Sequence, residues 1–473
     1  MIRKTKIIAT IGPASSSRAR LKSLIQKGVN VCRINFSHIS HEKAKEIVAS
    51  VKTINQELNV HTAILADLQG PKIRIGKLES PRKINAGEEI VFSTRKKSPE
   101  IFISYRGFAK DVKQKDAILL DDGKLRLQVL HTDNKNTVRA KVIVGGVIYS
   151  NKGVNLPKTK TSLPCLTKKD KEDLNFILNQ NIEWLALSFV RDAKDVLTLK
   201  RILKKNNSNI GVVSKIEKPE AIKSIDEIIF HSDAIMVARG DLGVEIPASK
   251  VPEIQKRIVS KAIEKSKPVI IATQMLESMT ISPTATRAEV NDVANSVIDG
   301  SDAVMLSGET SIGKYPLKAV DTMRKIIRDI EKGDYSFNSE FDFKKYRGPI
   351  RKKMITNSIC SHATQLSEQV GAKAIITITH SGYNAIKTSS YRPRAFIYAF
   401  TNNYSILNKL SLAWGVQAYY YGRGGTTDQA ILETKEILKK YNHIKKGDLV
   451  INLASMPAIS KGMTNMIKLS KVE

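Results

Sequence analysis

The chain repeats one pattern eight times: a short apolar run rich in β-branched residues, a polar or glycine-bearing turn, and then a stretch with helical periodicity. Strands that alternate with helices predict a parallel sheet. Eight such units predict an α/β fold in which the strands close into a (β/α)8 barrel. The predicted strands are Lys6–Thr10, Val29–Ile34, Ala63–Asp67, Trp184–Phe189, Ile210–Ile216, Ala234–Ala238, Val269–Thr273 and Ala303–Ser307.

Two segments depart from this pattern. Residues 71–163 read as short alternating strands separated by turn signals such as Asp121-Asp122-Gly123, which predicts a small all-β domain inserted into a barrel loop. Barrel active sites lie in the loops after the strands, so an insertion there is well placed to act as a lid. Residues 346–473 predict a small C-terminal α/β domain, with a helix over 353–369 and strands over 374–379, 395–399, 417–421 and 448–453.

We therefore expect three domains. They are a catalytic (β/α)8 TIM barrel (1–70 and 164–345), an inserted β-barrel lid (71–163) and a C-terminal α/β regulatory domain (346–473). A length of 473 residues agrees with about three domains. No apolar run approaches the roughly 18 residues of a membrane helix, and the basic N-terminus lacks a signal-peptide pattern. Three widely spaced cysteines (Cys32, Cys165, Cys360) show no metal or redox spacing. We expect a cytoplasmic protein with no membrane partner.

The formal net charge of +31 is unusual for such a chain. A basic surface can indicate a nucleic-acid partner, because it attracts phosphate backbones. Here the lysines are spread along the whole sequence, without an arginine-rich tail or interleaved aromatic residues. We therefore favour a solvated lysine-rich surface over nucleic-acid binding, and we expect the charge to attract anionic substrates.

Polar residues gather at the ends of six of the predicted barrel strands. Catalytic groups of such barrels sit at the C-terminal ends of strands, so the six clusters on one rim indicate an active site. Their residues are Arg33, Asn35, Ser37 and His38; Asp67, Leu68, Lys72 and Arg74; Lys215 and Glu217; Arg239, Gly240 and Asp241; Thr273 and Gln274; and Ser307 and Glu309.

Lys215 and Glu217 alternate along one strand, so both side chains point to the same side of it. Alone, such a pair is more often a structural ion pair. Asp241 changes this interpretation, because two carboxylates with substrate oxygens and water form an oxygen-rich Mg²⁺ site. Lys215 could then neutralise a phosphoryl group in transfer, a reaction that asks mainly for positioning and positive charge.

Two other patterns suit an anionic substrate. The turn from Arg239 to Gly243 follows a strand and could present backbone N–H groups to an anion, although a capped helix start would look the same. Arg33 and Arg74 could clamp a phosphate, although either one alone is more often a rim salt bridge.

The motifs TKIIATIGPAS, RINFSH, GPKIRIG, NKGVNLP, SKIE, ARGDLGVEIP, ATQMLESM, TATRAEVNDVANSVIDG and MLSGET occur in this order. Together they resemble the pyruvate kinase family, from residue 4 to about residue 320 and more loosely beyond. The resemblance implies a glycolytic phosphotransferase that moves the phosphoryl group of phosphoenolpyruvate to ADP, with barrel, lid and C-terminal domains and a homotetrameric assembly.

The same resemblance implies roles for individual residues. Lys215 is similar to the lysine that stabilises the transferring phosphoryl group, and Arg33 to the arginine that binds the substrate phosphate. Glu217 and Asp241 resemble the Mg²⁺ ligands, and the amides of Gly240 and Asp241 with Thr273 resemble the cradle for the substrate carboxylate. The nucleotide would lie against Thr10, Pro13, His38, Arg74 and Lys152. Thr273, or Ser307 and Glu309 through water, would lie near the proton delivered to the enolate, and the sequence leaves this donor open.

One departure from the commonest family pattern concerns K⁺. Its site in most members matches Asn35, Ser37, Asp67 and the carbonyl of Leu68. Those members carry a glutamate at the Lys72 position and a threonine at the Leu68 position. This chain resembles the potassium-independent branch, and a lysine ammonium can supply the positive charge of K⁺. We therefore expect catalysis without a monovalent cation; the alternative is that Lys72 is one more solvated lysine.

The C-terminal domain has a turn where the family often binds a sugar-phosphate effector. Thr379, Ser381 and Gly382 could hold a phosphate there, but His380 and Asn384 replace the usual lysine and final serine. Regulation by fructose 1,6-bisphosphate, by another phosphate or by none stays open.

Two other functions compete with this interpretation. Another Mg²⁺-dependent barrel enzyme of phosphoenolpyruvate or enolate chemistry would share the carboxylates and the arginine but would not require ADP. A nucleic-acid-binding protein on a retired enzyme scaffold would show salt-sensitive RNA binding without turnover. The intact set of Lys215, Glu217, Asp241 and Arg33 argues against retirement.

Overall fold

Eight parallel strands close into a barrel in the computed structural model, which describes residues 3–96, 100–157, 159–333, 352–422, 425–456 and 463–473. Around the barrel the order is β1-β16-β15-β14-β13-β12-β3-β2. The strands are β1 (Lys6–Ile11), β2 (Val31–Asn35), β3 (Ala63–Asp67), β12 (Trp184–Leu187), β13 (Gly211–Ile216), β14 (Ala234–Ala238), β15 (Val269–Ala272) and β16 (Ala303–Leu306). The predicted fold class is confirmed. β12 ends earlier than predicted because Phe189 takes a positive φ of 55°, which an extended strand excludes.

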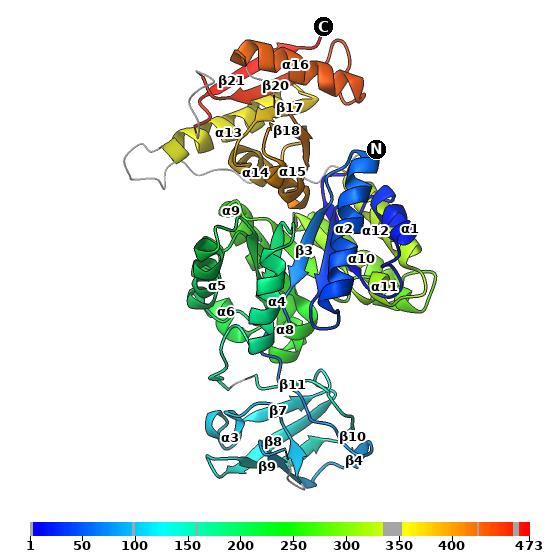
Figure 1. Ribbon diagram of the computed structural model, residues 1–473, viewed down its shortest axis with the longest axis vertical. Helices are drawn as coiled ribbons and strands as arrows, with labels where there is room; N and C mark the ends of the chain where they lie inside the picture. The colour runs from blue at the N-terminus through cyan, green and yellow to red at the C-terminus, as the bar shows by residue number, and fades with distance from the viewer. Residues whose placement is uncertain (1–2, 97–99, 158, 334–351, 423–424, 457–462) are drawn as a thin grey trace.

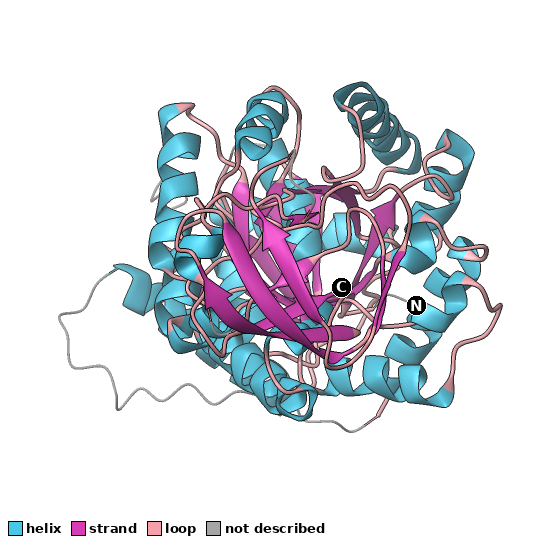
Figure 2. Ribbon diagram, turned by 90° about the horizontal axis from the view of Figure 1, so that it is seen from below, coloured by secondary structure: helices cyan, strands magenta, loops and turns pink. Residues whose placement is uncertain are grey.

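The barrel strands are apolar on both sides because both faces are covered. One set of side chains, including Ile8, Trp184 and Met236, fills the inside of the barrel, and the other set packs against the surrounding helices. Figure 2 looks along the molecule from the side of the inserted β domain, whose strands lie in front, and shows the barrel helices around the rim. These helices are α1 (Arg18–Gln26), α2 (His41–Leu58), α4 (Lys168–Leu178), α5 (Ala193–Lys205), α6 (Pro219–Lys223), α7 (Ile225–His231), α9 (Val251–Glu264), α10 (Arg287–Ile298) and α12 (Pro316–Ile330).

Local capping fixes where some helices begin, and in one case it also shapes the site. α4 begins with a capping box between Thr167 and Asp170, which satisfies backbone N–H groups that a helix start leaves free. Asp170 Oδ1 also accepts a hydrogen bond from the N–H of Gly70, at 3.1 Å. The same carboxylate therefore caps a helix and holds the loop that follows β3.

The segment between β3 and α4 forms the predicted small β domain. Its strands are β4 (Arg82–Ile84), β5 (Glu89–Ser93), β6 (Ile101–Phe102), β7 (Ala117–Leu120), β8 (Leu125–Thr132), β9 (Thr137–Val144), β10 (Gly146–Ile148) and β11 (Val154–Asn155). They form sheets of order β11-β7-β8-β9-β5-β6 and β10-β4, and a short helix α3 (Phe108–Asp111) covers a core that includes Phe92 and Phe108. This inserted β domain lies beyond the barrel end to which β3 leads (Figure 1).

The C-terminal α/β domain lies at the opposite end of the barrel (Figure 1). Its sheet has the order β19-β18-β17-β20-β21, with strands β17 (Ala374–Ile378), β18 (Phe396–Thr401), β19 (Val416–Tyr420), β20 (Leu449–Ala454) and β21 (Met466–Lys471). The antiparallel edge strand β21 was not predicted. The helices are α13 (Lys352–Gln369), α14 (Tyr383–Ser390), α15 (Tyr404–Lys409) and α16 (Thr427–Lys440). The expected boundary at residues 345 and 346 lies outside the described residues. Within those residues, no helix is both long and apolar enough to cross a membrane.

Candidate active site

Lys215 lies at the centre of the mouth formed by the C-terminal ends of the barrel strands. It is near the end of β13, and only 12% of its side chain is exposed. Its Nζ lies 3.3 Å from Asp67 Oδ1 and 3.0 Å from Glu217 Oε1, and it donates a 2.8 Å hydrogen bond to Ser188 Oγ. Three strands therefore position one ammonium group.

The charges of this cluster stabilise each other. Burial alone would lower the pKa of Lys215, but Asp67 and Glu217 outweigh it and hold that pKa above its ordinary value. Burial alone would raise the pKa of Asp67, but Lys215 and Arg33 hold it below its usual range. The buried lysine and the buried aspartate are therefore both ionised at neutral pH.

Arg33 completes the positive side of the mouth. Its Nε and Nη2 lie 2.7 and 2.6 Å from Asp67 Oδ2, and its Nη1 donates to Thr10 Oγ1 at 2.9 Å. Thr10 in turn donates to the carbonyl of Leu306 at 2.9 Å. The guanidinium plane is fixed by partners on β1 and β3, as a group that binds a phosphate needs to be.

Glu217 and Asp241 carry the carboxylates suited to a divalent cation. Glu217 Oε2 accepts a 2.7 Å hydrogen bond from the N–H of Phe189, while Oε1 has the ion-pair contact with Lys215 but no hydrogen bond of good geometry. Asp241 lies in the first turn of α8 (Arg239–Glu245), with 28% of its side chain exposed. Burial, and then the negative charge of Asp241, raise the pKa of Glu217 against the opposing effect of Lys215. A cation between the two carboxylates would relieve this cost, and their hard oxygen donors fit Mg²⁺.

Protein side chains alone do not complete such a site. Across the described ranges, no group of three or more His, Cys, Asp or Glu residues is arranged to hold a metal. The remaining oxygen ligands would have to come from a substrate or from water, as is usual for Mg²⁺ at phosphate-transfer sites.

The loop after β15 has a strained backbone. Thr273 and Gln274 have positive φ values of 68° and 55°, a conformation that side-chain-bearing residues adopt at a cost. The turn aims Thr273 Oγ1 at the N–H of Gly240, which donates to it at 2.7 Å, and the same hydroxyl donates to the carbonyl of Ala272 at 2.5 Å. Gly240 and Thr273 are therefore in contact, and here they satisfy each other.

Glu309 and Ser307 follow β16 at the next position of the rim. Both oxygens of Glu309 accept backbone N–H groups, from Leu276 at 3.0 Å and from Ser307 at 2.7 Å, and the carboxylate is 1% exposed. Burial raises the pKa of Glu309. The buried hydroxyl of Ser307 has no hydrogen-bond partner among the described residues. Glu309 thus ties two rim loops together, and the Ser307 hydroxyl is the free group of the two.

The residues expected at the nucleotide divide between barrel and β domain. Arg74 and Lys152 lie on adjacent segments of the β domain, where Arg74 Nη1 donates to Asn151 O at 3.0 Å and Lys152 Nζ lies 2.8 Å from Asp121 Oδ1. His38 is exposed on the barrel rim, and burial, followed by the charges of Arg74 and Lys72, lowers its pKa. Pro13 is also exposed. Thr10 instead orients Arg33.

Four groups are expected at the monovalent-cation site. They form hydrogen bonds or ion pairs mostly with other residues of the barrel rim. Asn35 Oδ1 accepts the N–H of Ser37 at 3.1 Å, and the carbonyl of Leu68 accepts Ser188 Oγ at 2.8 Å. Asp67 pairs with Arg33 and Lys215, as described above. Lys72 Nζ lies 3.5 Å from Asp241 Oδ1, so its charge is placed against the second of the candidate Mg²⁺ ligands.

The candidate effector turn lies at the start of α14, far from these groups. Thr379 is buried, and its Oγ1 accepts the N–H of Gly382 at 3.0 Å. Gly382 has a φ of 79°, which the glycine accommodates without strain. Ser381 is exposed, and its Oγ accepts the N–H of Tyr383 at 3.5 Å. The three residues meet in one turn, whose hydroxyls already bond to its own backbone.

Sequence reasoning missed Ser188, which follows β12 and bridges Lys215 to the carbonyl of Leu68. The signal was present: Leu187-Ser188-Phe189 ends the fourth barrel strand, and polar residues at strand ends marked the other rim positions. It also missed Asp67 as the shared partner of Arg33 and Lys215, because the pairing joins residues far apart in the chain.

Comparisons with known proteins identify the family. The family model for the pyruvate kinase barrel domain matches residues 2–320, and that for the pyruvate kinase alpha/beta domain matches residues 357–470. A pyruvate kinase of Staphylococcus aureus is 40% identical over 479 residues, covering 100% of this chain and 81% of the relative. Pyruvate kinase 2 of Synechocystis is 40% identical, covering 100% of this chain and 80% of the relative.

A solved structure agrees as well. The crystal structure of a pyruvate kinase from Cryptosporidium parvum superposes with a TM-score of 0.91 at 35% identity, covering 99% of this chain and 96% of that one. Family models, full-length relatives and the superposed structure all identify the same family. The chain therefore belongs to the pyruvate kinase family of phosphotransferases.

Proposed function

We propose that this chain transfers the phosphoryl group of phosphoenolpyruvate to ADP, giving pyruvate and ATP, with Mg²⁺ and without a monovalent cation. The observation that carries the proposal is the buried ammonium of Lys215, held between Asp67 and Glu217 at the barrel mouth. Phosphoryl transfer needs little covalent chemistry from a protein, so a fixed positive charge beside two carboxylates suits it.

Each residue of the mouth has a role in this proposal. Lys215 and Arg33 offset the negative charge that develops on the transferring group. The amides of Gly240 and Asp241, with the hydroxyl of Thr273, hold the carboxylate of phosphoenolpyruvate, which replaces the hydrogen bond between Gly240 and Thr273. Thr273 or the free hydroxyl of Ser307 delivers the proton to the enolate, and Glu309 positions both loops.

Glu217 and Asp241 would hold the Mg²⁺ ion. When bound, the ion supplies charge neutralisation to the phosphoryl oxygens and a template that orients the substrate. Thr10, Pro13, His38, Arg74 and Lys152 would line the side from which ADP approaches. Movement of the inserted β domain toward the barrel would then exclude water and limit hydrolysis.

Lys72 supports the part of the proposal that concerns potassium. Its ammonium lies 3.5 Å from Asp241 in the same mouth, and its positive charge would replace the charge that K⁺ supplies in other members. The double variant Lys72→Glu and Leu68→Thr carries the two residues of the K⁺-dependent members. We expect this variant to require K⁺ for activity. Lys72→Met, which removes the charge without restoring the cation site, should lose activity that K⁺ does not rescue.

The test is pyruvate formation from phosphoenolpyruvate, ADP and Mg²⁺ in a buffer free of K⁺ and Na⁺. Full activity there is the expected result. Activity that appears only after K⁺ is added would overturn the role of Lys72 but keep the reaction. Folded protein that is silent in both buffers, with and without ADP, would overturn the reaction itself.

The assembly and regulation that we propose follow the family. We infer a barrel of residues 1–70 and 164–345, a lid of residues 71–163, a regulatory domain of residues 346–473, and a homotetramer that light scattering would detect. A phosphate-bearing effector at Thr379, Ser381 and Gly382 should sharpen or shift the saturation curve for phosphoenolpyruvate. Titration of fructose 1,6-bisphosphate against that curve tests the effector, and Ser381→Ala is the matched variant.

A further inference from the structure

A pocket of about 660 Å³ lies where the N-terminal end of the barrel meets the C-terminal domain. Its wall is formed by the end of α2, the starts of β3 and β12, and α15. Lys215 and its partners lie at the other end of the strands, where barrel enzymes have their active sites, so this pocket is separate from the phosphoryl-transfer site. Its volume lies within the roughly 300–1,000 Å³ typical of small-molecule sites.

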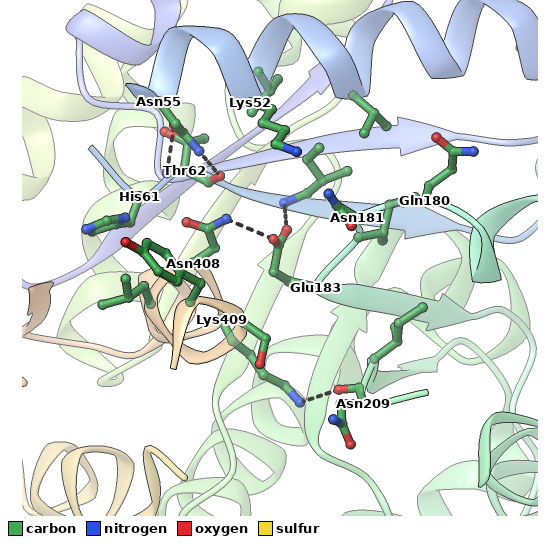
Figure 3. Close-up of a pocket in the computed structure, with 18 of the residues that line it drawn as sticks. Lys52, Asn55, His61, Thr62, Gln180, Asn181, Glu183, Asn209, Asn408 and Lys409 are labelled. Atoms are coloured by element: carbon green, nitrogen blue, oxygen red, sulfur yellow. Dashed lines mark hydrogen bonds between the residues drawn. The ribbon is translucent and has the colours of Figure 1, made fainter. Parts of the chain in front are cut away.

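Glu183 contributes a carboxylate to the pocket (Figure 3). Asn408 Nδ2 donates to its Oε1 at 2.9 Å, and the backbone N–H of Ile64 donates to its Oε2 at 2.8 Å. Burial raises the pKa of this carboxyl, whereas the hydrogen bonds from Asn408 and Ile64 favour its ionised form. Each oxygen can still accept a further hydrogen bond, which a hydroxyl group can donate.

Two lysines place positive charge in the same pocket. Lys409 Nζ donates to Asn209 O at 3.0 Å and lies 5.2 Å from the centre of the Trp184 ring. Lys52 forms no ion pair with any of the residues that the structure describes, and Figure 3 shows its side chain extending toward the pocket. Burial lowers the pKa of His61, so this side chain is neutral. Burial lowers the pKa of Lys409 from its ordinary value of 10.5. With both lysines and Glu183 ionised, the pocket carries one net positive charge, which a ligand with a single negative charge would balance.

The neutral lining indicates the rest of the ligand. The side-chain amides of Gln180 and Asn181 line the pocket and make no hydrogen bond with another described side chain, so they can donate to hydroxyl oxygens and accept from hydroxyl groups. Val51 and Leu178 offer apolar surface to a carbon skeleton. The ring of Tyr404 is already stacked on Tyr420, with centroids 4.5 Å apart, so one of its faces is occupied. The lining therefore suits a hydroxylated molecule better than an aromatic one.

We propose that this pocket binds a small hydroxylated carboxylate, with its charged group at Lys52 and its hydroxyls at Glu183 and the neighbouring amides. Lys52 and Glu183 belong to the barrel, whereas Asn408 and Lys409 belong to α15 of the C-terminal domain. A bound molecule would therefore contact both domains and strengthen their association. The site is independent of the reaction proposed above, so either can fail without the other.

The test uses three six-carbon polyols that differ in the group at one end: sorbitol (a neutral hydroxymethyl), gluconate (a carboxylate with one negative charge) and sorbitol 6-phosphate (a phosphate with up to two). The full-length protein has two tryptophans, and Trp184 lies beneath Lys409, so its fluorescence reports on the pocket. Trp414→Phe isolates that signal, and calorimetry on the unchanged protein gives a second readout in case this variant folds poorly. At constant ionic strength and without Mg²⁺, gluconate should bind with saturation, sorbitol should not bind, and sorbitol 6-phosphate should bind more weakly than gluconate.

Two single variants connect the binding to the pocket. Lys52→Met should weaken gluconate binding by about fivefold, the effect of losing one partly exposed charged contact. Lys45→Met removes the same charge two turns earlier on α2, outside the pocket lining, and should leave binding unchanged. The proposal is overturned if gluconate does not bind, if sorbitol 6-phosphate binds more tightly, or if both variants weaken binding equally.

Discussion

Burial and charge oppose each other at Lys215, and charge wins. An ammonium with 12% of its side chain exposed has lost most of its hydration, yet two carboxylates within 3.3 Å keep it protonated. The group can therefore present a full positive charge to a substrate in a site that excludes much of the solvent, where that charge acts more strongly than in water.

Replacement of this charge tests its role. Lys215→Met should lower kcat by about 10²–10³-fold, the usual effect of removing one group that stabilises charge in the transition state. The far-UV circular dichroism should stay native. Lys205→Met removes a lysine from the exposed end of α5 and should leave kcat unchanged, so equal losses in both variants would contradict the assignment.

Lys387 is a buried lysine at which burial outweighs the nearby charge of Glu264. Burial lowers its pKa to about 8, and its Nζ donates to Ser266 Oγ at 2.9 Å, between the C-terminal domain and the barrel. Below pH 8 the folded protein carries a poorly solvated charge that the unfolded chain solvates freely, so this residue costs stability at low pH. The cost disappears as the pH rises from about 8 through 10.5, the ordinary value.

The corresponding measurement is the thermal midpoint of the protein and of Lys387→Met between pH 7 and pH 10. The difference between them should shift in favour of the unchanged protein as the pH rises. A difference that stays constant over this range would show that the pKa of Lys387 is not lowered by folding.

At the scale of elements, the apolar runs in the sequence predicted the barrel strands, because packing on both faces requires apolar residues there. The barrel strands are apolar throughout because helices cover one face and the barrel interior the other, and their sequences show it. β21 was missed because most of its residues are partly exposed and its sequence, Met466–Lys471, has no clear alternation. Its extended form depends on pairing with β20, which no local pattern reveals.

The candidate site was also predictable in part: the sequence indicates its residues but not all of their contacts. Position at a strand end is enough to mark Lys215, Glu217, Asp241 and Arg33 in the sequence. The contact of Lys72 with Asp241 could not be predicted, since it depends on how the chain leaves β3 toward the β domain. The mutual hydrogen bond of Gly240 and Thr273 depends in the same way on a strained turn.

α8 connects the β domain to the candidate Mg²⁺ ligands. At its C-terminal end, Glu245 Oε1 accepts hydrogen bonds from Asn155 of β11 at 2.8 Å and from Lys218, the neighbour of Glu217, at 2.6 Å. Asn155 thus links Glu245 to the β domain, and Lys218 links it to the segment that carries Glu217. The side chain of Glu245 is 1% exposed. The position of Asp241 on this helix is therefore coupled to the β domain.

Asn155→Ala removes one of these hydrogen bonds. A buried hydrogen bond to a charged group contributes about 1.5–3 kcal/mol, so loosening α8 should raise the Mg²⁺ concentration for half-maximal rate about tenfold. The kcat at saturating Mg²⁺ should fall much less. Gln128→Ala, an exposed amide of β8, is the control, and a change in kcat alone would argue against a positioning role.

At the scale of the whole molecule, a buried ion pair joins the barrel to the C-terminal domain. Arg392 Nη2 lies 2.8 Å from Asp302 Oδ2, and the two side chains are 2% and 4% exposed. Asp302 also accepts the N–H of Trp414 at 2.9 Å and that of Val269 at 3.0 Å. One carboxylate therefore satisfies donors from both domains.

Asp302→Ala should uncouple the two domains. Removing one partner of a buried pair costs about 3–5 kcal/mol, because the other charge stays buried without compensation. Differential scanning calorimetry should show a separate, earlier transition for the C-terminal domain. Asp329→Ala, which breaks an exposed pair with Lys332, should leave a profile like that of the unchanged protein; a single unshifted transition in Asp302→Ala would contradict the coupling.

The pairing of β1 with β16 has a consequence for synthesis on the ribosome. β1 emerges about 300 residues before β16, its second neighbour in the barrel. At roughly 5–20 residues per second, β1 waits about 15–60 s with one edge unpaired. The inserted β domain can assemble meanwhile from contacts within its own segment. We expect a nascent chain stopped before β16 to need a chaperone over the exposed edge of β1, and that need should end once the last barrel strand is released.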